Sequence, residues 1–200
     1  MRTLFVLMTL VCVVIGTWAV YVNPYRRQLA SLAVVNRLQG NSARAPADGP
    51  QWQRWLVTTF LGREAFVQVT DVHLNGKEVN DESLRALGGL TELRKLSLDY
   101  TPITDEGIAV VRSMPKLQDL SLRYTKITDR GAAEIGALPN LRTAHLTGTK
   151  ITDSGIEDLE KLRSANELYI RWTGISNEGA ARLAARLPDC DIFHHALVTP

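Results

Sequence analysis

The amino-acid sequence predicts an α/β solenoid with parallel strands on its concave side and short helices on its convex side. Helical segments and one transmembrane helix are expected to precede it. Three observations predict this architecture: a seven-residue phrase recurs at a fixed period, a comb of apolar residues precedes each copy, and an uncharged stretch lies near the N-terminus. The phrase reads TPITDEG at 101–107, TKITDRG at 125–131, TKITDSG at 149–155 and TGISNEG at 173–179. Its copies begin 24 residues apart, and periods of about 20–50 residues are typical of stacked repeats.

The uncharged stretch covers residues 4–22. Its nineteen residues are about enough to cross a bilayer as a helix, and Trp18 and Tyr21 lie near one end, as interfacial aromatic residues do. The sequence therefore favours a transmembrane anchor over residues 1–25. A cleaved signal peptide is the alternative, although its apolar region is usually shorter and no A-x-A-like site follows here.

Two segments separate this anchor from the repeats. Residues 26–50 read as a helix followed by a linker, because the stretch 40–50 is rich in Gly, Ala and Pro. Residues 51–68 return to an amphipathic helical pattern with two tryptophans. A terminal repeat would otherwise expose its apolar edge, so we expect this second helix to cap the repeat that starts at Val69. The alternative role is an aromatic helix that contacts a membrane surface or a partner.

Five repeats are predicted over residues 69–188, and the tail 189–200 is expected to cap the far end. Each unit begins with a comb such as LRKLSL from Leu93, whose last two apolar residues lie on one face of a strand. A Thr follows, then an apolar position, then Thr-Asp or Ser-Asn pairs of the kind that cap helix N-termini. Apolar residues three or four apart then predict a short helix, which ends at Pro115 in the second unit and at Pro139 in the third.

Each recurring residue of the phrase has a structural interpretation. The first Thr is expected to satisfy backbone groups at the turn, the apolar residue to anchor the loop in the core, and the Gly to let the helix approach the loop closely. The aspartates are each expected to cap their own helix: Asp105, Asp129 and Asp153.

On these residues the chain resembles bacterial leucine-rich-repeat proteins whose units read L-x-x-L-x-L-x-x-T-x-I-T-D-x-G. More distantly it is similar to the cysteine-containing repeats of F-box proteins, where a Cys takes the place of Thr101, Thr125 and Thr149. The resemblance covers five units, and the anchor and following helices also look like the N-terminal layout of the bacterial proteins. It implies a single-pass protein of the bacterial cell membrane with extracytoplasmic repeats, or a secreted one if the N-terminal segment is cleaved. We do not expect the ubiquitin-ligase role, since no F-box-like segment stands before the repeats in this sequence.

Composition and motifs argue against several classes of function. The net charge is +2 and the basic residues form no run, which does not favour nucleic-acid binding. Two cysteines provide no disulfide framework, and no H-x-x-x-H or C-x-x-C motif is present. His73 and His145 occupy the same comb position three units apart, about 15 Å at the spacing of strands, which is too far for one metal. We therefore expect no enzyme activity, cofactor, metal or small-molecule substrate.

A protein or peptide partner is the remaining expectation. The strand residues on the concave face include Tyr, Trp and Arg, the types most enriched in interface hot spots. The candidate binding residues are Asp99, Tyr100, Arg123, Tyr124, Tyr169, Arg171 and Trp172. The sequence thus favours a membrane-tethered interaction module. The alternative is a structural or envelope-associated protein that associates through its N-terminal helices and has no specific ligand on its concave face.

Overall fold

The computed structural model describes residues 23–46, 51–61, 67–76 and 78–194. Within these residues, no helix combines the length and the apolar character that a membrane crossing requires. The predicted anchor segment 4–22 lies outside the described residues.

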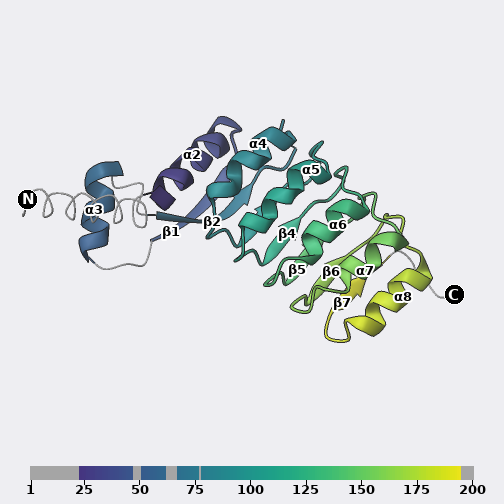
Figure 1. The fold of residues 1–200 in the computed structure, drawn as a ribbon. Helices are drawn as coiled ribbons and strands as arrows, with labels where there is room; N and C mark the ends of the chain where they lie inside the picture. Colours follow the sequence, from purple (N-terminus) through teal and green to yellow (C-terminus); the bar gives the residue numbers. More distant parts are fainter. Residues whose placement is uncertain (1–22, 47–50, 62–66, 77, 195–200) are drawn as a thin grey trace, which may run out of the picture.

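A seven-stranded sheet forms the body of the protein, with its strands in chain order (Figure 1). The first two strands are antiparallel and the rest are parallel. The strands are β1 (Asn41–Pro46), β2 (Val67–His73), β3 (Lys95–Ser97), β4 (Asp119–Ser121), β5 (Thr143–His145), β6 (Glu167–Tyr169) and β7 (Asp191–Phe193). From β3 onward each residue pairs with the residue 24 positions later, as Leu96 does with Leu120. The 24-residue period of the sequence is therefore the register of the sheet.

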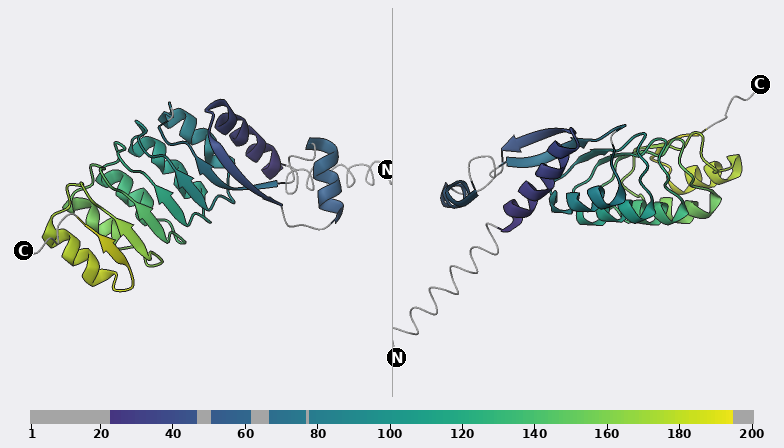
Figure 2. Two further views of the ribbon diagram at one scale, coloured as in Figure 1. Left: turned by 180° about the vertical axis from the view of Figure 1, so that it is seen from behind. Right: turned by 90° about the horizontal axis from the view of Figure 1, so that it is seen from above.

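Short helices cover one face of this sheet and leave the other open (Figure 2). Along the repeats they are α4 (Asp81–Arg85), η3 (Ala86–Gly89), α5 (Asp105–Ile108), η4 (Ala109–Ser113), α6 (Asp129–Gly136), η5 (Asp153–Gly155), α7 (Ile156–Leu159) and α8 (Asn177–Arg186). The side chains of the strands that point away from the helices form what we call the open face, which corresponds to the predicted concave face.

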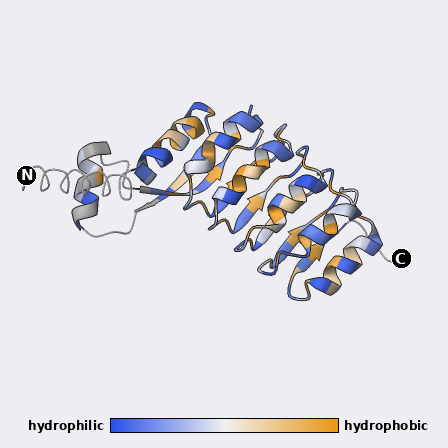
Figure 3. Ribbon diagram, in the orientation of Figure 1, coloured by the Kyte–Doolittle hydropathy of each residue, from blue (hydrophilic) through white to orange (hydrophobic). Residues whose placement is uncertain are grey.

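One continuous core lies between the sheet and the helices. The comb leucines and the apolar residue of the phrase fill it, as predicted: Leu93, Leu96, Leu98 and Ile103 are at most 1% exposed. Figure 3 shows hydrophobic residues along the strands and hydrophilic ones on the outer turns of the helices. Each such side chain contributes about 1.5–3 kcal/mol by its burial, so the stacked units support one another.

The Thr of the phrase has the predicted role. Its hydroxyl donates to the carbonyl oxygen three residues earlier, from Thr101 to Leu98 at 2.6 Å and from Thr125 to Leu122 at 2.8 Å. Thr149 and Thr173 repeat this bond. Because the Thr side chains of the first three copies are buried, the bond satisfies carbonyls that would otherwise be unpaired at the turn.

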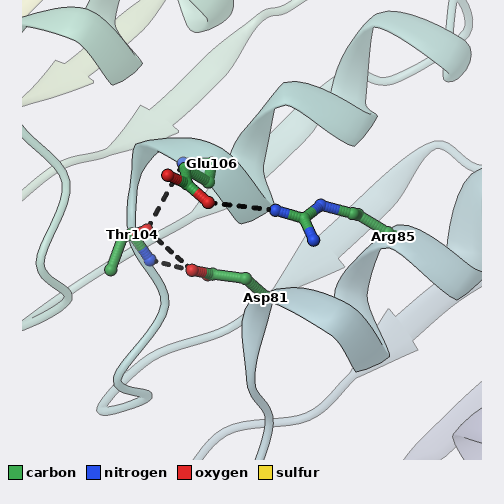
Figure 4. A network of polar contacts seen from close by, with 4 residues as sticks. All are labelled: Asp81, Arg85, Thr104 and Glu106. Atoms are coloured by element: carbon green, nitrogen blue, oxygen red, sulfur yellow. Dashed lines mark hydrogen bonds and ion pairs between the residues drawn. The ribbon is translucent and has the colours of Figure 1, made fainter.

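The aspartates have a different role from the predicted one. Thr104 is the N-cap of α5 and its side-chain oxygen accepts from Glu106 N, whereas Asp81 reaches forward from the preceding unit (Figure 4). The Asp81 carboxylate accepts from Thr104 N at 2.9 Å and from Thr104 Oγ1 at 2.7 Å. Asp105 bonds Thr128 and Asp129 bonds Thr152 in the same way, and Asp153 accepts from Ser176 N. These carboxylates form a ladder that joins consecutive units. At its end, the Ser176 backbone N–H and then its hydroxyl lower the pKa of the Asp153 carboxyl.

The glycine of the phrase makes room for this ladder. A Cβ at Gly107 would lie 2.3 Å from Asp81 Oδ1, and one at Gly155 would lie 2.7 Å from Asp129 Oδ1. The expected close approach is confirmed, and its partner is the carboxylate of the preceding unit.

The N-terminal end of the sheet departs from the prediction. The supposed linker at 40–50 contains β1, which pairs with the edge of β2 that has no preceding repeat. Its proline suits an edge strand: Pro46 is the last residue of β1, where a missing N–H costs least. The richness of 40–50 in Gly, Ala and Pro, which predicts a linker, masks this short strand.

The capping helix is also not the predicted one. The helix α2 (Asn23–Arg37) packs on η3 through Ser31, Leu32 and Val35, each at most 5% exposed. The Ser31 hydroxyl donates to Ala86 O at 2.7 Å and accepts from Gly89 N at 3.2 Å. The predicted cap, α3 (Gln51–Leu61), packs beside α2 instead.

Two adjacent glycines test the docking of α2. A Cβ at Gly89 would lie 2.6 Å from Arg27 O in the backbone of α2, whereas nothing lies closer than 3.4 Å to one at Gly88. We expect Gly89→Ala to destabilise the protein by about 1–3 kcal/mol and to speed amide exchange in α2, because the helix must move away. Gly88→Ala, the matched control, is expected to change stability by less than about 0.5 kcal/mol. Equal effects in thermal unfolding and hydrogen exchange would show that α2 does not dock here.

At the opposite end, the tail supplies a further strand. β7 pairs with β6 and begins 24 residues after it, so the repeat register continues past the predicted fifth unit. Cys190 lies partly buried just before β7, and its burial raises the pKa of the thiol to about 11. The thiol is therefore protonated at neutral pH and is not a nucleophile.

Candidate protein-binding surface

The seven predicted binding residues fall into separate places. Tyr100, Tyr124 and Trp172 lie just beyond the ends of β3, β4 and β6, where the chain turns toward the helices, and we call them the aromatic rim. Arg123 and Arg171 precede the last two of these. The others are Tyr169, which belongs to the open face, and Asp99, which is buried.

The aromatic rim is a row of ring contacts. The ring centroids of Tyr100 and Tyr124 lie 4.9 Å apart at an interplanar angle of 15°, and those of Tyr124 and Trp172 lie 6.1 Å apart and are tilted by 33°. Gly148 occupies the repeat position between Tyr124 and Trp172, and a Cβ there would lie 2.5 Å from Tyr124 Cδ1. The glycine therefore leaves space for the Tyr124 ring, which reaches across it to Trp172. All three rings remain exposed, at 64%, 41% and 58%.

The backbone of the rim is left-handed at every unit. The φ angles of Tyr100, Tyr124 and Trp172 are 59°, 54° and 53°, and Gly76 and Gly148 have φ of 59° and 73° at the equivalent positions. The same hydrogen bond to the next unit fixes the turn at the first four of these positions along the chain, for example from Tyr100 N to Arg123 O at 2.8 Å. A bulky residue with positive φ is an outlier that costs about 1–3 kcal/mol and is found where function demands it. Three aromatic side chains thus occupy positions that glycine would fill without strain.

Asp99 is a structural residue rather than an exposed contact. It is 8% exposed, and its Oδ1 accepts from Ser121 Oγ at 2.5 Å and from Arg123 N at 3.0 Å. One unit earlier, Asn75 Oδ1 accepts the equivalent two hydrogen bonds, from Ser97 Oγ and from Asp99 N. Asp99 therefore holds the turn that presents Arg123 and Tyr124.

A second stack lies on the open face. His145, Tyr169 and Phe193 follow one another on β5, β6 and β7, with centroid distances of 4.3 and 4.4 Å. Among these, only Tyr169 was a predicted binding residue. Phe193 was missed because β7 was read as a tail, although the DIF at 191–193 stands 24 residues after the ELY at 167–169.

A small hollow lies beside this stack. It has a volume of about 240 Å³, and Ser97 and Ser121 are among its lining residues, together with His73, Lys95, Asp119, Arg123 and His145. Lys95 is paired with Asp119 at 2.7 Å, and Arg123 Nη2 lies 3.0 Å from His145 Nδ1. The described residues contain no group of three or more His, Cys, Asp or Glu side chains that could hold a metal. The hollow is the size of one or two side chains and is open to the face.

The neighbouring arginine makes His145 a reporter of this site. Burial, and then the positive charge of Arg123, lower the pKa of His145 below its usual value. The folded protein therefore loses stability as pH falls from about 6.5, the pKa of an unfolded histidine, toward the folded value. We expect Arg123→Gln to raise the pKa of His145 in an NMR titration and to reduce this loss. An unchanged His145 pKa would mean that the two side chains do not interact in solution.

The comparisons with known proteins agree with this geometry. The sequence model of the family described as Leucine Rich repeat matches residues 90–111 and 113–136. No curated protein matches the chain in sequence. The fold resembles internalin C2 of Listeria monocytogenes, with a TM-score of 0.54 and 24% identity over 70% of this chain. The aligned part spans 56% of that protein.

A plant structure extends the similarity over more of the chain. The leucine-rich-repeat ectodomain of the receptor kinase SOBIR1 from Arabidopsis thaliana aligns with 84% of this chain and 91% of its own, with a TM-score of 0.54 and 16% identity. Identities this low support the fold and not a shared ligand. The units at 90–111 and 113–136 therefore match leucine-rich repeats in sequence, and the fold of the chain is that of a leucine-rich-repeat solenoid.

Proposed function

We propose that this protein is a membrane-tethered interaction module that binds a protein or peptide partner along the aromatic rim and the adjoining open face. The observation that carries the proposal is the backbone of the rim, where Tyr100, Tyr124 and Trp172 stand at left-handed positions that Gly76 and Gly148 fill in other units. Ring stacking and chain entropy roughly offset the left-handed strain at these positions, so folding alone gives no preference for exposed aromatic side chains over glycine there. Exposed Tyr and Trp beside Arg are the residues that dominate binding energy in protein interfaces.

The membrane tether is the second part of the proposal. Residues 4–22 carry no charge, and α2 begins directly after them at Asn23. Because α2 docks on the first repeat through Ser31, an anchor at 4–22 would hold the solenoid close to the membrane surface. We place the repeats outside the cytoplasm of a bacterial cell. Carbonate extraction and protease digestion of intact cells test both points, and N-terminal sequencing distinguishes an anchored from a secreted chain.

Glycine substitutions separate binding from stability at the rim. In the variant Tyr100→Gly/Tyr124→Gly/Trp172→Gly, each glycine relieves about 1–2 kcal/mol of left-handed strain. Each also loses about 0.5–1.5 kcal/mol of stacking and costs about 0.5–1 kcal/mol of chain entropy. We therefore expect a stability within about 1 kcal/mol per site of the parent, and a loss of partner binding.

Proximity labelling in intact cells, from a tag after Pro200, measures that loss. The neighbours of the parent protein should disappear in the triple glycine variant. Trp55→Ala is the matched control, because Trp55 is 65% exposed but lies on α3, away from the rim. Neighbours that persist in the glycine variant would show that the rim is not the binding surface.

The same control tests a second candidate function, a structural protein that associates through its N-terminal helices. The exposed Trp55 favours that candidate. If the protein has this second function, light scattering should show that the full chain self-associates. Trp55→Ala should abolish that self-association, and the triple glycine variant of the rim should retain it.

A further inference from the structure

The two tyrosines of the aromatic rim shield one another's faces. Tyr100 and Tyr124 come from neighbouring units and stack nearly parallel, at 15°, so each covers a face of the other. Stacking leaves the ring edges uncovered, and both residues remain exposed. Aromatic edges carry partial positive charge, whereas faces carry partial negative charge. The edges of this pair therefore suit carboxylate and carbonyl oxygens.

Positive side chains flank the same rim. Arg123 and Arg171 stand immediately before Tyr124 and Trp172, and Lys126 and Lys150 are exposed on the turns that follow Tyr124 and Gly148. Within the described part of the chain, Lys126, Lys150 and Arg171 take part in none of the ion pairs. The acid that precedes the rim residue Tyr100, Asp99, is bound to Ser121 and to the Arg123 backbone. Asp129 and Asp153, which follow Lys126 and Lys150 closely in sequence, accept hydrogen bonds from Thr152 and Ser176. Lys126, Lys150 and Arg171 therefore remain available to carboxylates of a ligand.

The acidic side chains of the open face lie at the opposite ends of the strands. The first residues of the three-residue strands are in register with one another, and three of these five are acids: Asp119, Glu167 and Asp191. Asp119 is paired with Lys95, another of the five. These acids stand at the starts of the strands, whereas the bases of the rim follow the strand ends. A ligand that follows the rim therefore passes Lys126, Lys150 and Arg171.

The hollow on the open face is not part of this positive surface. Besides Arg123 and His145, its lining includes the carboxylates of Asp99 and Asp119. Lys95 already bonds Asp119, and Arg123 Nη2 lies 3.0 Å from His145 Nδ1, so an acidic side chain is better placed along the rim than in the hollow.

From these observations we infer that the ligand of the rim is an acidic, extended peptide segment of a partner protein. It would run across the repeats, with its carboxylates beside Lys126, Lys150 and Arg171. This inference rests on the proposed function and specifies the chemistry of the partner.

Selection of random 12-residue peptides by phage display on the full chain in detergent micelles tests it. We expect the selected peptides to carry an excess of Asp and Glu, and their affinity by fluorescence anisotropy to weaken as salt rises. The charge reversal Lys126→Glu/Lys150→Glu/Arg171→Glu should weaken these peptides about tenfold or more. The matched control Arg94→Glu/Arg130→Glu/Arg142→Glu changes the net charge equally at exposed arginines outside the rim, and should retain them.

The outcomes separate this inference from the proposed function. Neutral or basic peptides that bind the parent but not the glycine variant of the rim would overturn the acidic ligand and leave the function standing. Acidic peptides that the two charge variants bind equally would overturn it as well. Peptides that bind the glycine variant as tightly as the parent would overturn both proposals. Failure to enrich any peptide over empty micelles would contradict the acidic segment, since the library contains such sequences.

Discussion

Replacing Leu120 with alanine is expected to lower the free energy of unfolding by about 2–5 kcal/mol, among the largest effects of any single substitution in this chain. Leu120 is the central residue of β4 and is fully buried. In the sheet it pairs with Leu96 on one side and with Ala144 on the other. Because Ala144 is already small, the space left by Leu120 would open onto a strand that cannot fill it.

Leu96→Ala is the matched comparison, since Leu96 is also buried but lies between Val72 and Leu120. Larger neighbours can close around its cavity, so we expect a smaller loss, measured by urea unfolding of both variants. A solenoid unit contacts only its neighbours, so Leu120→Ala should also loosen the coupling between the units on either side and broaden the transition. Equal losses in the two variants would show that Ala144 does not limit repacking.

The repeat units could be predicted from sequence because their determinants are local. The comb fixes which strand residues face the core, and Thr101 needs only the carbonyl of Leu98, three residues away. The role of Asp105 could not be predicted in the same way. The Thr-Asp pair at 104–105 suggests that Asp105 caps its own helix, whereas its carboxylate accepts from Thr128 in the next unit, 23 residues later. The recurring Gly at the start of each helix was the available signal, because it vacates the space that the carboxylate enters.

The binding surface was predicted only in part for a related reason. The sequence predicts Tyr100, Tyr124 and Trp172 as binding residues from their residue types and their place in the repeat, but residue type alone does not predict the φ angle of the backbone. Gly76 and Gly148 at the same repeat position were the sequence signal for a left-handed turn. Combined with that signal, Tyr100, Tyr124 and Trp172 could have been identified as strained. The burial of Asp99 could not be predicted from the sequence, because it depends on a hydrogen bond from the hydroxyl of Ser121 in the next strand.

The N-terminal cap was the least predictable element, because it depends on tertiary contacts. The α2 helix is held by Ser31 against Ala86 and Gly89, which are more than fifty residues away. Composition favoured the Trp-rich helix α3 for the role, yet Trp55 is 65% exposed.

The ladder of aspartates gives the second large effect. Asp81→Ala is expected to lower the free energy of unfolding by about 1.5–3 kcal/mol, because the carboxylate accepts two hydrogen bonds from Thr104 and joins the first unit to the second. Glu106→Ala is the matched control. Glu106 lies on the neighbouring helix α5 in Figure 4 and carries the same charge, but it pairs with Arg85 at 3.2 Å on the surface. An exposed pair of this kind contributes less than about 1 kcal/mol.

The two variants remove equal charge at neighbouring positions, so the difference between their unfolding free energies isolates the ladder from general electrostatics. The variant Asp81→Asn refines the comparison. Its amide oxygen can still accept one of the two hydrogen bonds from Thr104, so we expect a smaller loss of unfolding free energy than in Asp81→Ala. A solenoid is a chain of nearest-neighbour interfaces, so a bond that recurs between units contributes at every step. If Asp81→Ala and Glu106→Ala proved equally mild, the apolar core alone would hold the units in register, and the recurring Asp of the phrase would need another explanation.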